Sequence, residues 1–318
     1  MQSIDSDVFQ HLRDWLVEGI KPWLCTIVRT VGSSPRPAGS ILAIAGDGRQ
    51  IGSVSGGCVE EDLLERLRNG VYAGQSPELV EYGVSAEENE RLGLPCGGRL
   101  TLLLERLDDN ARPWVDDVLQ ALQERRVLQR HLDLETGISR LVPAAHFSPL
   151  SIDSRQLVQC FGPRMRMLLV GAGQLAHSLA ELGLAMDYEI VVTDPREQIL
   201  QDWEGPEVQL LQGMPDDIIR EHANDHHSLV ITLTHDPRID DMALMEALVS
   251  EAWYVGALGS QRTTDKRVQR LRELDITEEQ LARLHAPVGL EIGSKTPLEI
   301  AVAIMAELIQ LRRGLPAS

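Results

Sequence analysis

Two of the four cysteines lie directly against pairs of glycines, an arrangement that suits a thiol in a ligand-binding turn. The residues are Gly56, Gly57 and Cys58 in the first turn and Cys96, Gly97 and Gly98 in the second. Glycine pairs permit unusual backbone conformations and let a ligand approach the backbone closely. A thiolate in such a turn suits a thiophilic ligand. Each cysteine also has a simpler interpretation, as a small side chain that fills a gap.

The first turn is expected to join a strand to a helix. Apolar residues precede it at 40–44 and 51–54, and Val59–Arg68 has apolar side chains at helical spacing. Free N–H groups at the start of a helix favour an anion, and they bias a neighbouring thiol toward the thiolate. The motif therefore predicts a site for a phosphorylated, thiophilic ligand, with Cys58 as its central thiol and Glu60 among the residues that contact the ligand. Cys25 and Cys160 have no glycines beside them and are expected to be structural.

A loop rich in glycine, proline and serine, Gly32–Gly39, contains Arg36 between two prolines. The prolines limit the freedom of the backbone. A guanidinium held in this way beside a pocket could clamp a phosphate. The alternative, an arginine exposed in an ordinary loop, stays open on the sequence alone.

Size and charge exclude several classes of function. The 318 residues are enough for two domains, and 43% hydrophobic and 25% charged residues are ordinary for a globular chain. A net charge of −18 argues against non-specific binding to nucleic acid or to an anionic membrane. No apolar run approaches the roughly 20 residues that span a bilayer. The N-terminus lacks a secretory signal pattern, and the cysteines have neither disulfide-scaffold nor zinc-site spacing. We therefore expect a cytoplasmic protein with reduced thiols.

The second half of the chain opens with the pattern of a Rossmann unit. An apolar strand, Met167–Val170, leads into Gly171 and Gly173, and a helix over Leu175–Gly183 follows. A second apolar strand ends on Asp194. In this fold the glycines permit a tight turn, the helix N-terminus holds a phosphate or pyrophosphate, and the acidic residue accepts from ribose hydroxyls. A Rossmann scaffold without a nucleotide is the alternative.

Polar residues follow the next apolar strands of this half. One strand ends in Thr234–Asp241 (THDPRIDD) and another in Gly256–Thr263 (GALGSQRT). Ligands of an open parallel sheet bind beyond the carboxyl ends of its strands. The residues expected to line a cleft there are His235, Asp236, Gly259, Ser260 and Arg262. Each of them could also be a helix cap or part of a surface ion pair.

The predicted fold class is α/β with two domains. We expect an N-terminal α+β domain over residues 1–145, with the two glycine–cysteine turns. A linker over 146–164 is expected because periodicity fades between Pro143 and Pro163. A Rossmann-like domain with a doubly wound parallel sheet is expected over 165–318.

The motifs together resemble one family. GSVSGGCVEE, LPCGGRL, GAGQLA, THDPRID, GALGSQRT and APVGLEIGSKTPLEIAVAIMAEL occur in that order in the XdhC/CoxI family. The resemblance extends over nearly the whole chain, from about Trp23 to Leu311. Within the family, overall length suggests the PaoD-like branch, which serves an aldehyde oxidoreductase.

The resemblance implies a molybdenum-cofactor chaperone for enzymes such as xanthine dehydrogenase, aldehyde oxidoreductase and carbon monoxide dehydrogenase. Such a protein binds the mature cofactor, either molybdopterin or molybdopterin cytosine dinucleotide. It assists replacement of a terminal oxygen ligand of molybdenum by sulfur and hands the product to an apo-molybdoenzyme client. The other implied partners are a cysteine desulfurase and a cofactor-synthesis nucleotidyltransferase. On this interpretation Cys58 is the catalytic thiol and the molybdenum ligand, and the glycine turns hold phosphates.

Two other classes of function remain open. The Rossmann half could belong to an NAD(P)-dependent oxidoreductase, although no Tyr-x-x-x-Lys pair or similar proton relay is visible. A nucleotide-sensing module without catalysis would leave Cys58 and Cys96 unexplained. The sequence also leaves open whether the protein catalyses a reaction, and whether its apolar C-terminal helix, Leu298–Leu311, forms a homodimer.

Overall fold

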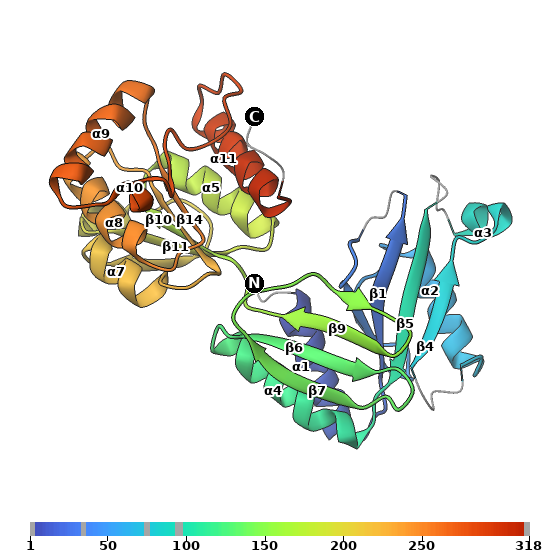
Figure 1. The fold of residues 1–318 in the computed structure, drawn as a ribbon. Coiled ribbons are helices and arrows are strands. Elements are labelled where there is room, and N and C mark those ends of the chain that lie inside the picture. Colours follow the sequence, from blue (N-terminus) through green and yellow to red (C-terminus); the bar gives the residue numbers. More distant parts are fainter. Residues whose placement is uncertain (1–3, 33–35, 73–76, 93–97, 315–318) are drawn as a thin grey trace. The chain divides into compact units, whose positions relative to one another are not determined.

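The computed structural model describes residues 4–32, 36–72, 77–92 and 98–314, without the side chains of Cys58, Ala86 and Asn89. The chain divides into two compact units between Pro163 and Arg164 (Figure 1). Each unit has its own sheet or sheets and its own hydrophobic cores. Within the described residues, no helix is both long and apolar enough to cross a membrane.

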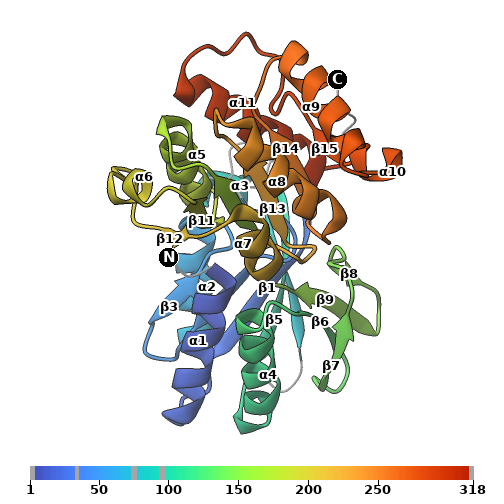
Figure 2. The same ribbon diagram turned by 90° about the vertical axis from the view of Figure 1, so that its left-hand side faces the viewer.

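The N-terminal unit is built on an antiparallel sheet in the order β3-β2-β1-β5-β4. Its strands are β1 (Trp23–Val31), β2 (Ile41–Ile44), β3 (Gln50–Gly52), β4 (Glu78–Tyr82) and β5 (Arg99–Arg106). Its helices are α1 (Ile4–Val17), α2 (Cys58–Arg68), α3 (Ala86–Arg91), η1 (Asp109–Ala111) and α4 (Arg112–Gln123). Successive side chains of β1 alternate between two cores, because a strand presents neighbouring residues to opposite faces. Helices α1 and α4 pack side by side on one face, and α2 covers the other (Figures 1 and 2).

A second antiparallel sheet completes this unit, in the order β7-β6-β9-β8. Its strands are β6 (Val127–Asp133), β7 (Ser139–Ala144), β8 (Ser151–Ile152) and β9 (Gln156–Phe161). Strands β6 and β7 form a hairpin. The segment 146–164, expected as a linker, instead contributes β8 and β9, and β9 pairs with β6 along its length. These strands were not predicted because they are short and flanked by prolines, and because β9 pairs with β6, about 30 residues earlier in the chain.

The C-terminal unit is a parallel sheet in the order β12-β11-β10-β13-β14-β15. Its strands are β10 (Arg166–Val170), β11 (Glu189–Asp194), β12 (Gln209–Gln212), β13 (Ser228–Thr232), β14 (Tyr254–Ala257) and β15 (Leu284–His285). Its helices are α5 (Gln174–Ala185), α6 (Glu197–Gln201), α7 (Pro215–His222), α8 (Pro237–Val249), α9 (Gln261–Glu273), α10 (Glu278–Leu281) and α11 (Pro297–Arg312). Counted along this unit, the strand order is 3-2-1-4-5-6, which is the Rossmann order.

Helices cover both faces of the parallel sheet (Figure 1). Helices α5 and α11 pack on one face, and α7, α8 and α9 pack on the other. The strands are accordingly apolar on both sides, as the continuous run Met167–Val170 illustrates. The predicted fold class, an α+β unit followed by a doubly wound Rossmann-like domain, is confirmed. The order of strands reverses beside β10, so the switch point lies between the carboxyl ends of β10 and β13.

Candidate functional site

The predicted N-terminal site residues leave the five-stranded sheet at one end. The last residue of β1 pairs with the first residue of β5, so the loop with Arg36 and the segment that ends at Gly98 emerge there. Gly52, the last residue of β3, pairs with the second residue of β2, so the Gly-Gly turn emerges at that end too. Arg36 is partly buried and Gly98 is buried. Cys96 and Gly97 lie outside the described residues.

The residues on either side of the second glycine–cysteine motif pack beside helix α2. Leu92 and Leu100 belong to the same buried core as Val59, the second residue of α2. An ion pair between Asp62 of α2 and Arg91 of α3, with an O···N distance of 2.8 Å, also holds the chain against α2 just before the motif. The described residues that flank the second motif therefore lie close to the helix that begins at Cys58.

The first turn has the backbone conformation that the glycine pair predicted. Gly56 has φ +90° and Gly57 has φ +150°, in a region that other residues rarely adopt. A Cβ atom at either position would meet no described atom within 4 Å. The glycines are therefore needed for backbone conformation, and the described residues leave space for a ligand beside them. Helix α2 begins directly afterwards, at Cys58.

The carboxylate of Glu60 fills the inside of this turn. The side chain is 4% exposed. Its Oε1 accepts hydrogen bonds from Ser53 Oγ (2.8 Å), Val54 N (2.9 Å), Ser55 N (2.8 Å) and Gly56 N (3.1 Å). Its Oε2 accepts from Gly57 N (3.0 Å) and from the Ser55 hydroxyl. Burial opposes ionisation, but the hydrogen bonds, led by those from Ser55, outweigh it and lower the pKa of Glu60 to about 2.

The backbone N–H groups of residues 54–57, which come just before α2, are therefore not available to an external anion. An internal anion already satisfies them. Glu60 was predicted to contact the cofactor. Its carboxylate oxygens instead accept hydrogen bonds from the turn that precedes Cys58. The signal was present in the sequence: a glutamate three residues after the helix N-cap position is the reaching-back half of a capping box.

The other two cysteines are buried. Cys25 lies in β1 with no exposed surface, and burial raises the pKa of its thiol strongly, so the thiol stays protonated. Cys160 lies in β9 with its Sγ atom 3.1 Å from the Ser148 hydroxyl. Both environments suit the structural role expected of these cysteines. Among the described residues no group of three or more His, Cys, Asp and Glu could hold a metal ion.

In the C-terminal unit the two fingerprint glycines have different tasks. Gly171 has φ +106°, and a Cβ atom there would lie 2.8 Å from the Thr234 side chain. This glycine is therefore required by the packing of its turn against the loop after β13. A Cβ atom at Gly173 would meet no described atom within 4 Å, and Gly173 is the N-cap of α5 without a side-chain cap. The start of α5 is thus approachable within this unit, as a phosphate-binding turn requires.

The carboxylate of Asp194 is turned toward its own loop. The residue has no exposed surface. Its Oδ1 accepts from Arg196 N (3.0 Å) and Arg196 Nε (2.8 Å), and its Oδ2 accepts from Arg196 Nη2 (2.8 Å) and Ala172 N (3.3 Å). Burial opposes ionisation, but the bonds from Arg196 and Ala172 outweigh it and lower the pKa of Asp194. A ribose hydroxyl could bond to the Asp194 carboxylate only if the Arg196 side chain moved away from it. Arg196 was not among the residues predicted from the sequence, although its position directly after Asp194 and Pro195 is a signal for such a contact.

The residues predicted after β13 and β14 lie at the same carboxyl edge. Asp236 caps α8 by accepting from Arg238 N (3.0 Å), and Ser260 caps α9 by accepting from Thr263 N (3.3 Å). Bonds to Arg238 lower the pKa of Asp236 to about 2. His235 and Arg262 are exposed, and Gly259 is partly buried. The parallel strands therefore bring all five residues to the edge where the α5 turn lies, and two of them already act as caps.

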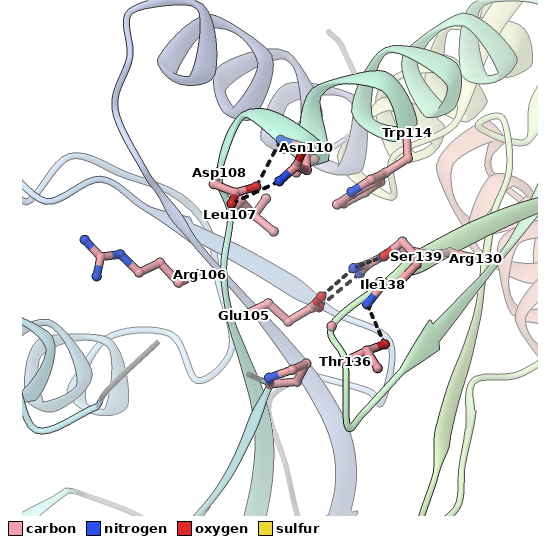
Figure 3. A pocket seen from close by; sticks show the side chains of 13 residues that line it. Glu105, Arg106, Leu107, Asp108, Asn110, Trp114, Arg130, Thr136, Ile138 and Ser139 are labelled. Atoms are coloured by element: carbon pink, nitrogen blue, oxygen red, sulfur yellow. Dashed lines mark hydrogen bonds and ion pairs between the residues drawn. The ribbon is translucent and has the colours of Figure 1, made fainter. Parts of the chain in front are cut away.

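A cavity of about 290 Å³ lies elsewhere, in the N-terminal unit (Figure 3). Its inner wall holds a buried ion pair of Glu105 and Arg130, and the Arg130 guanidinium lies 4.0 Å from the centre of the Trp114 ring. Both Arg130 Nε and Nη2 donate to the Ser139 hydroxyl. Of the described residues predicted for the functional site, none lines this cavity. Its buried charged groups are bonded to one another, and they join β5 to β6 and β7.

Comparison with known protein families gives two matches, in the order of the two units. Residues 15–83 match the model described as the XdhC and CoxI family. Residues 167–308 match the model described as the XdhC Rossmann domain.

Individual relatives are similar over most of their length. The chain is 27% identical to a protein of Bacillus subtilis named as a probable xanthine dehydrogenase component, with 91% of this chain and 93% of the relative covered. It is 28% identical to "Molybdenum cofactor insertion chaperone PaoD" of Escherichia coli, with 93% and 85% covered. A crystal structure described as a xanthine dehydrogenase from Bacillus halodurans has a TM-score of 0.74 at 27% identity and covers 99% of this chain and 96% of its own.

Proposed function

The chain belongs to the XdhC/CoxI family, and from that premise we propose that it is an insertion chaperone for the molybdenum cofactor. It binds the mature cofactor, assists exchange of a terminal oxygen ligand of molybdenum for sulfur, and delivers the product to an apo-molybdoenzyme of the xanthine dehydrogenase or aldehyde oxidoreductase class. The observation that carries this proposal is the similarity, along nearly the whole chain, to a relative named as such a chaperone.

The geometry of the Gly-Gly-Cys turn supports the role of Cys58. Glu60 satisfies the N–H groups of this turn internally, so the turn is hydrogen-bonded before any ligand arrives. Presentation of a reactive group in a pre-formed turn lowers the entropy lost on binding. The described residues leave the space within 4 Å of a Cβ atom at Gly56 or Gly57 open, which is compatible with a ligand close to this turn. In this proposal Cys58 is the thiol that faces molybdenum, and Glu60 positions the turn without contacting the cofactor.

Within the C-terminal unit, we propose the start of α5 as a contact for a phosphate group of the cofactor. The helix has no side-chain cap, and the absent side chain of Gly173 leaves its N-terminus approachable. Arg196 is half exposed and lies on the buried carboxylate of Asp194, close to the same turn through Ala172. Guanidinium groups suit phosphate oxygens, so Arg196 joins Gly171, Gly173 and Asp194 as a candidate contact.

The Rossmann strand order is the one observation that favours a second function, an NAD(P)-dependent oxidoreductase. That function would need tight binding of NAD(P)H and a substrate. Fluorescence titration with NADH distinguishes the two proposals. The chaperone proposal predicts affinity for the molybdenum cofactor without comparable affinity for NADH.

The test of the proposal is a transfer assay. The protein is loaded with cofactor, mixed with an apo-molybdoenzyme of the xanthine dehydrogenase class, a cysteine desulfurase and cysteine, and client activity is followed. We expect wild type and the buried-cysteine control Cys160→Ser to activate the client, and Cys58→Ser to fold but to fail. Equal activation by Cys58→Ser would remove the thiol from the mechanism. No activation by wild type, with cofactor bound and a competent client, would refute the insertion role.

A further inference from the structure

A buried ion pair underlies the carboxyl edge of the parallel sheet and lies outside the contacts described so far. Asp240 of α8 is 1% exposed and Arg267 of α9 is 3% exposed. Arg267 Nη2 donates to Asp240 Oδ2 over 2.9 Å. An isolated pair of this kind is a poor way to gain stability, because taking both charges out of water costs about as much as their attraction returns. Its presence calls for another explanation.

Asp240 Oδ1 and Arg267 Nη1 are bonded to two loops, whereas the buried Arg267 Nε has no partner among the described residues. Asp240 Oδ1 accepts from the Thr234 hydroxyl (2.7 Å) and from Thr234 N (3.3 Å), at the end of β13. Arg267 Nη1 donates to Leu258 O (3.1 Å), at the end of β14. The pair therefore spans the gap between the loop with His235 and Asp236 and the loop with Gly259 and Ser260.

The same bridge reaches the glycine turn of β10. Thr234 packs so closely against Gly171 that a Cβ atom there would lie 2.8 Å from the Thr234 side chain. On the other side, a Cβ atom at Gly259 would lie 3.5 Å from Arg267 Nη1. Asp240 and Arg267 are thus bonded to the loops after β13 and β14, and the first of these loops packs against the glycine turn after β10.

A neighbouring ion pair joins the same two helices and serves as a comparison for the buried pair. Asp241 of α8 and Arg270 of α9 form a bidentate pair, with Nη2 and Oδ1 2.9 Å apart. No bond from this pair to either loop is among those that the structure describes, and the Arg270 side chain is 36% exposed. Asp241 and Arg270 already join α8 to α9. The buried pair of Asp240 and Arg267 differs because it also bonds to the two loops.

We infer that Asp240 and Arg267 are positioning residues, which hold the loops after β13 and β14 at the spacing that cofactor binding requires. This inference rests on the proposed function, because the ligand that depends on the spacing is the molybdenum cofactor. Neither residue contacts the ligand. Asp240 acts through the hydroxyl and the N–H group of Thr234, and Arg267 acts through the carbonyl oxygen of Leu258.

The experiment compares Asp240→Asn and Arg267→Met with Asp241→Asn and Arg270→Met, all in the full-length protein. Molybdopterin cofactor released from a molybdoenzyme is titrated at a temperature where every variant is folded by circular dichroism. We expect the first two variants to bind roughly tenfold or more weakly, and the second two to bind within a few-fold of wild type. Arg267→Lys should not restore binding, because a lysine keeps the charge but cannot hold Asp240 and Leu258 in a fixed planar fork.

Amide hydrogen exchange provides a readout that does not depend on the ligand. Exchange at Thr234 and at the amides following Leu258 should accelerate in Asp240→Asn and Arg267→Met and stay unchanged in the Asp241 and Arg270 variants. Wild-type affinity in Asp240→Asn and Arg267→Met, or equal losses in all four variants, would overturn the inference. If wild type binds no cofactor, the proposed function fails, and unchanged exchange in the Asp240 and Arg267 variants then overturns the positioning role separately.

Discussion

Replacement of Glu60 by glutamine should destabilise the Gly-Gly-Cys turn, although the two side chains have nearly the same shape. The carboxylate accepts six hydrogen bonds from residues 53–57. The amide of glutamine offers one oxygen and places an NH₂ group against backbone N–H donors. Donors then face donors in a buried site, which costs free energy beyond the lost attraction.

The size of the effect follows from the pKa of Glu60. The difference between its ordinary pKa of 4.5 and its value of about 2 corresponds to roughly 3 kcal/mol of folding free energy. Because the folded-state pKa is depressed, this stabilisation is complete above about pH 4.5 and is lost as the pH falls toward 2. The stability gap between wild type and Glu60→Gln should therefore be full at pH 7 and should shrink below pH 4.5.

Urea-dependent hydrogen exchange of the segment 53–68 measures the local free energy of opening at each pH. The matched control is Glu61→Gln, because Glu61 is the next residue of the same helix and is exposed. We expect Glu60→Gln to lose about 2–3 kcal/mol at pH 7 and the control to lose less than about 0.5 kcal/mol. The reasoning is refuted if Glu60→Gln opens like wild type at pH 7, or if the gap widens as the pH falls.

Three further outcomes are expected. Gly57→Val should lose cofactor binding and strain the turn by about 1–3 kcal/mol, because φ is +150° although no described atom lies in the way; titration beside an unfolding curve tests this, and unaltered binding would place the turn away from the site. Gly173→Val should weaken cofactor binding with little change in stability, because its Cβ would enter space that the described atoms leave open at the start of α5; a stability loss with unchanged affinity would contradict the phosphate role. Asp194→Ala should release Arg196 and weaken binding of the dinucleotide form about tenfold, measured by titration with both cofactor forms. Equal affinity of wild type and Asp194→Ala for the dinucleotide would remove Asp194 from the site.

The sequence predicts those features of the fold that depend on local pattern. Strand Met167–Val170 and the glycine turn after it follow from a short apolar run beside turn residues, and the structure starts this strand only one residue earlier. The Rossmann order follows from alternation of such runs with helices. Strand β9 escaped prediction because its partner lies far back in the chain and its flanks are rich in proline.

For the candidate site, the sequence predicts where residues lie along the sheet but not what their side chains contact. The sequence identifies which residues gather at an edge, since strand ends of a parallel sheet share one side, and His235 and Ser260 are found there. It does not reveal where a carboxylate points. Glu60 and Asp194 were both predicted to face a ligand, yet each bonds to its own turn. The pairing of Asp240 with Arg267, across two helices, has no local pattern at all.

The most direct test of the central claim is the content of the purified protein. Wild type and Cys58→Ser are purified from cells supplied with molybdate and assayed for molybdenum, pterin and nucleotide. The chaperone proposal predicts that wild type carries molybdenum and pterin in equal amounts, that nucleotide is present only if the dinucleotide form is the cargo, and that Cys58→Ser carries less molybdenum. Wild type that carries neither molybdenum nor pterin, but binds NADH tightly, would contradict the proposal.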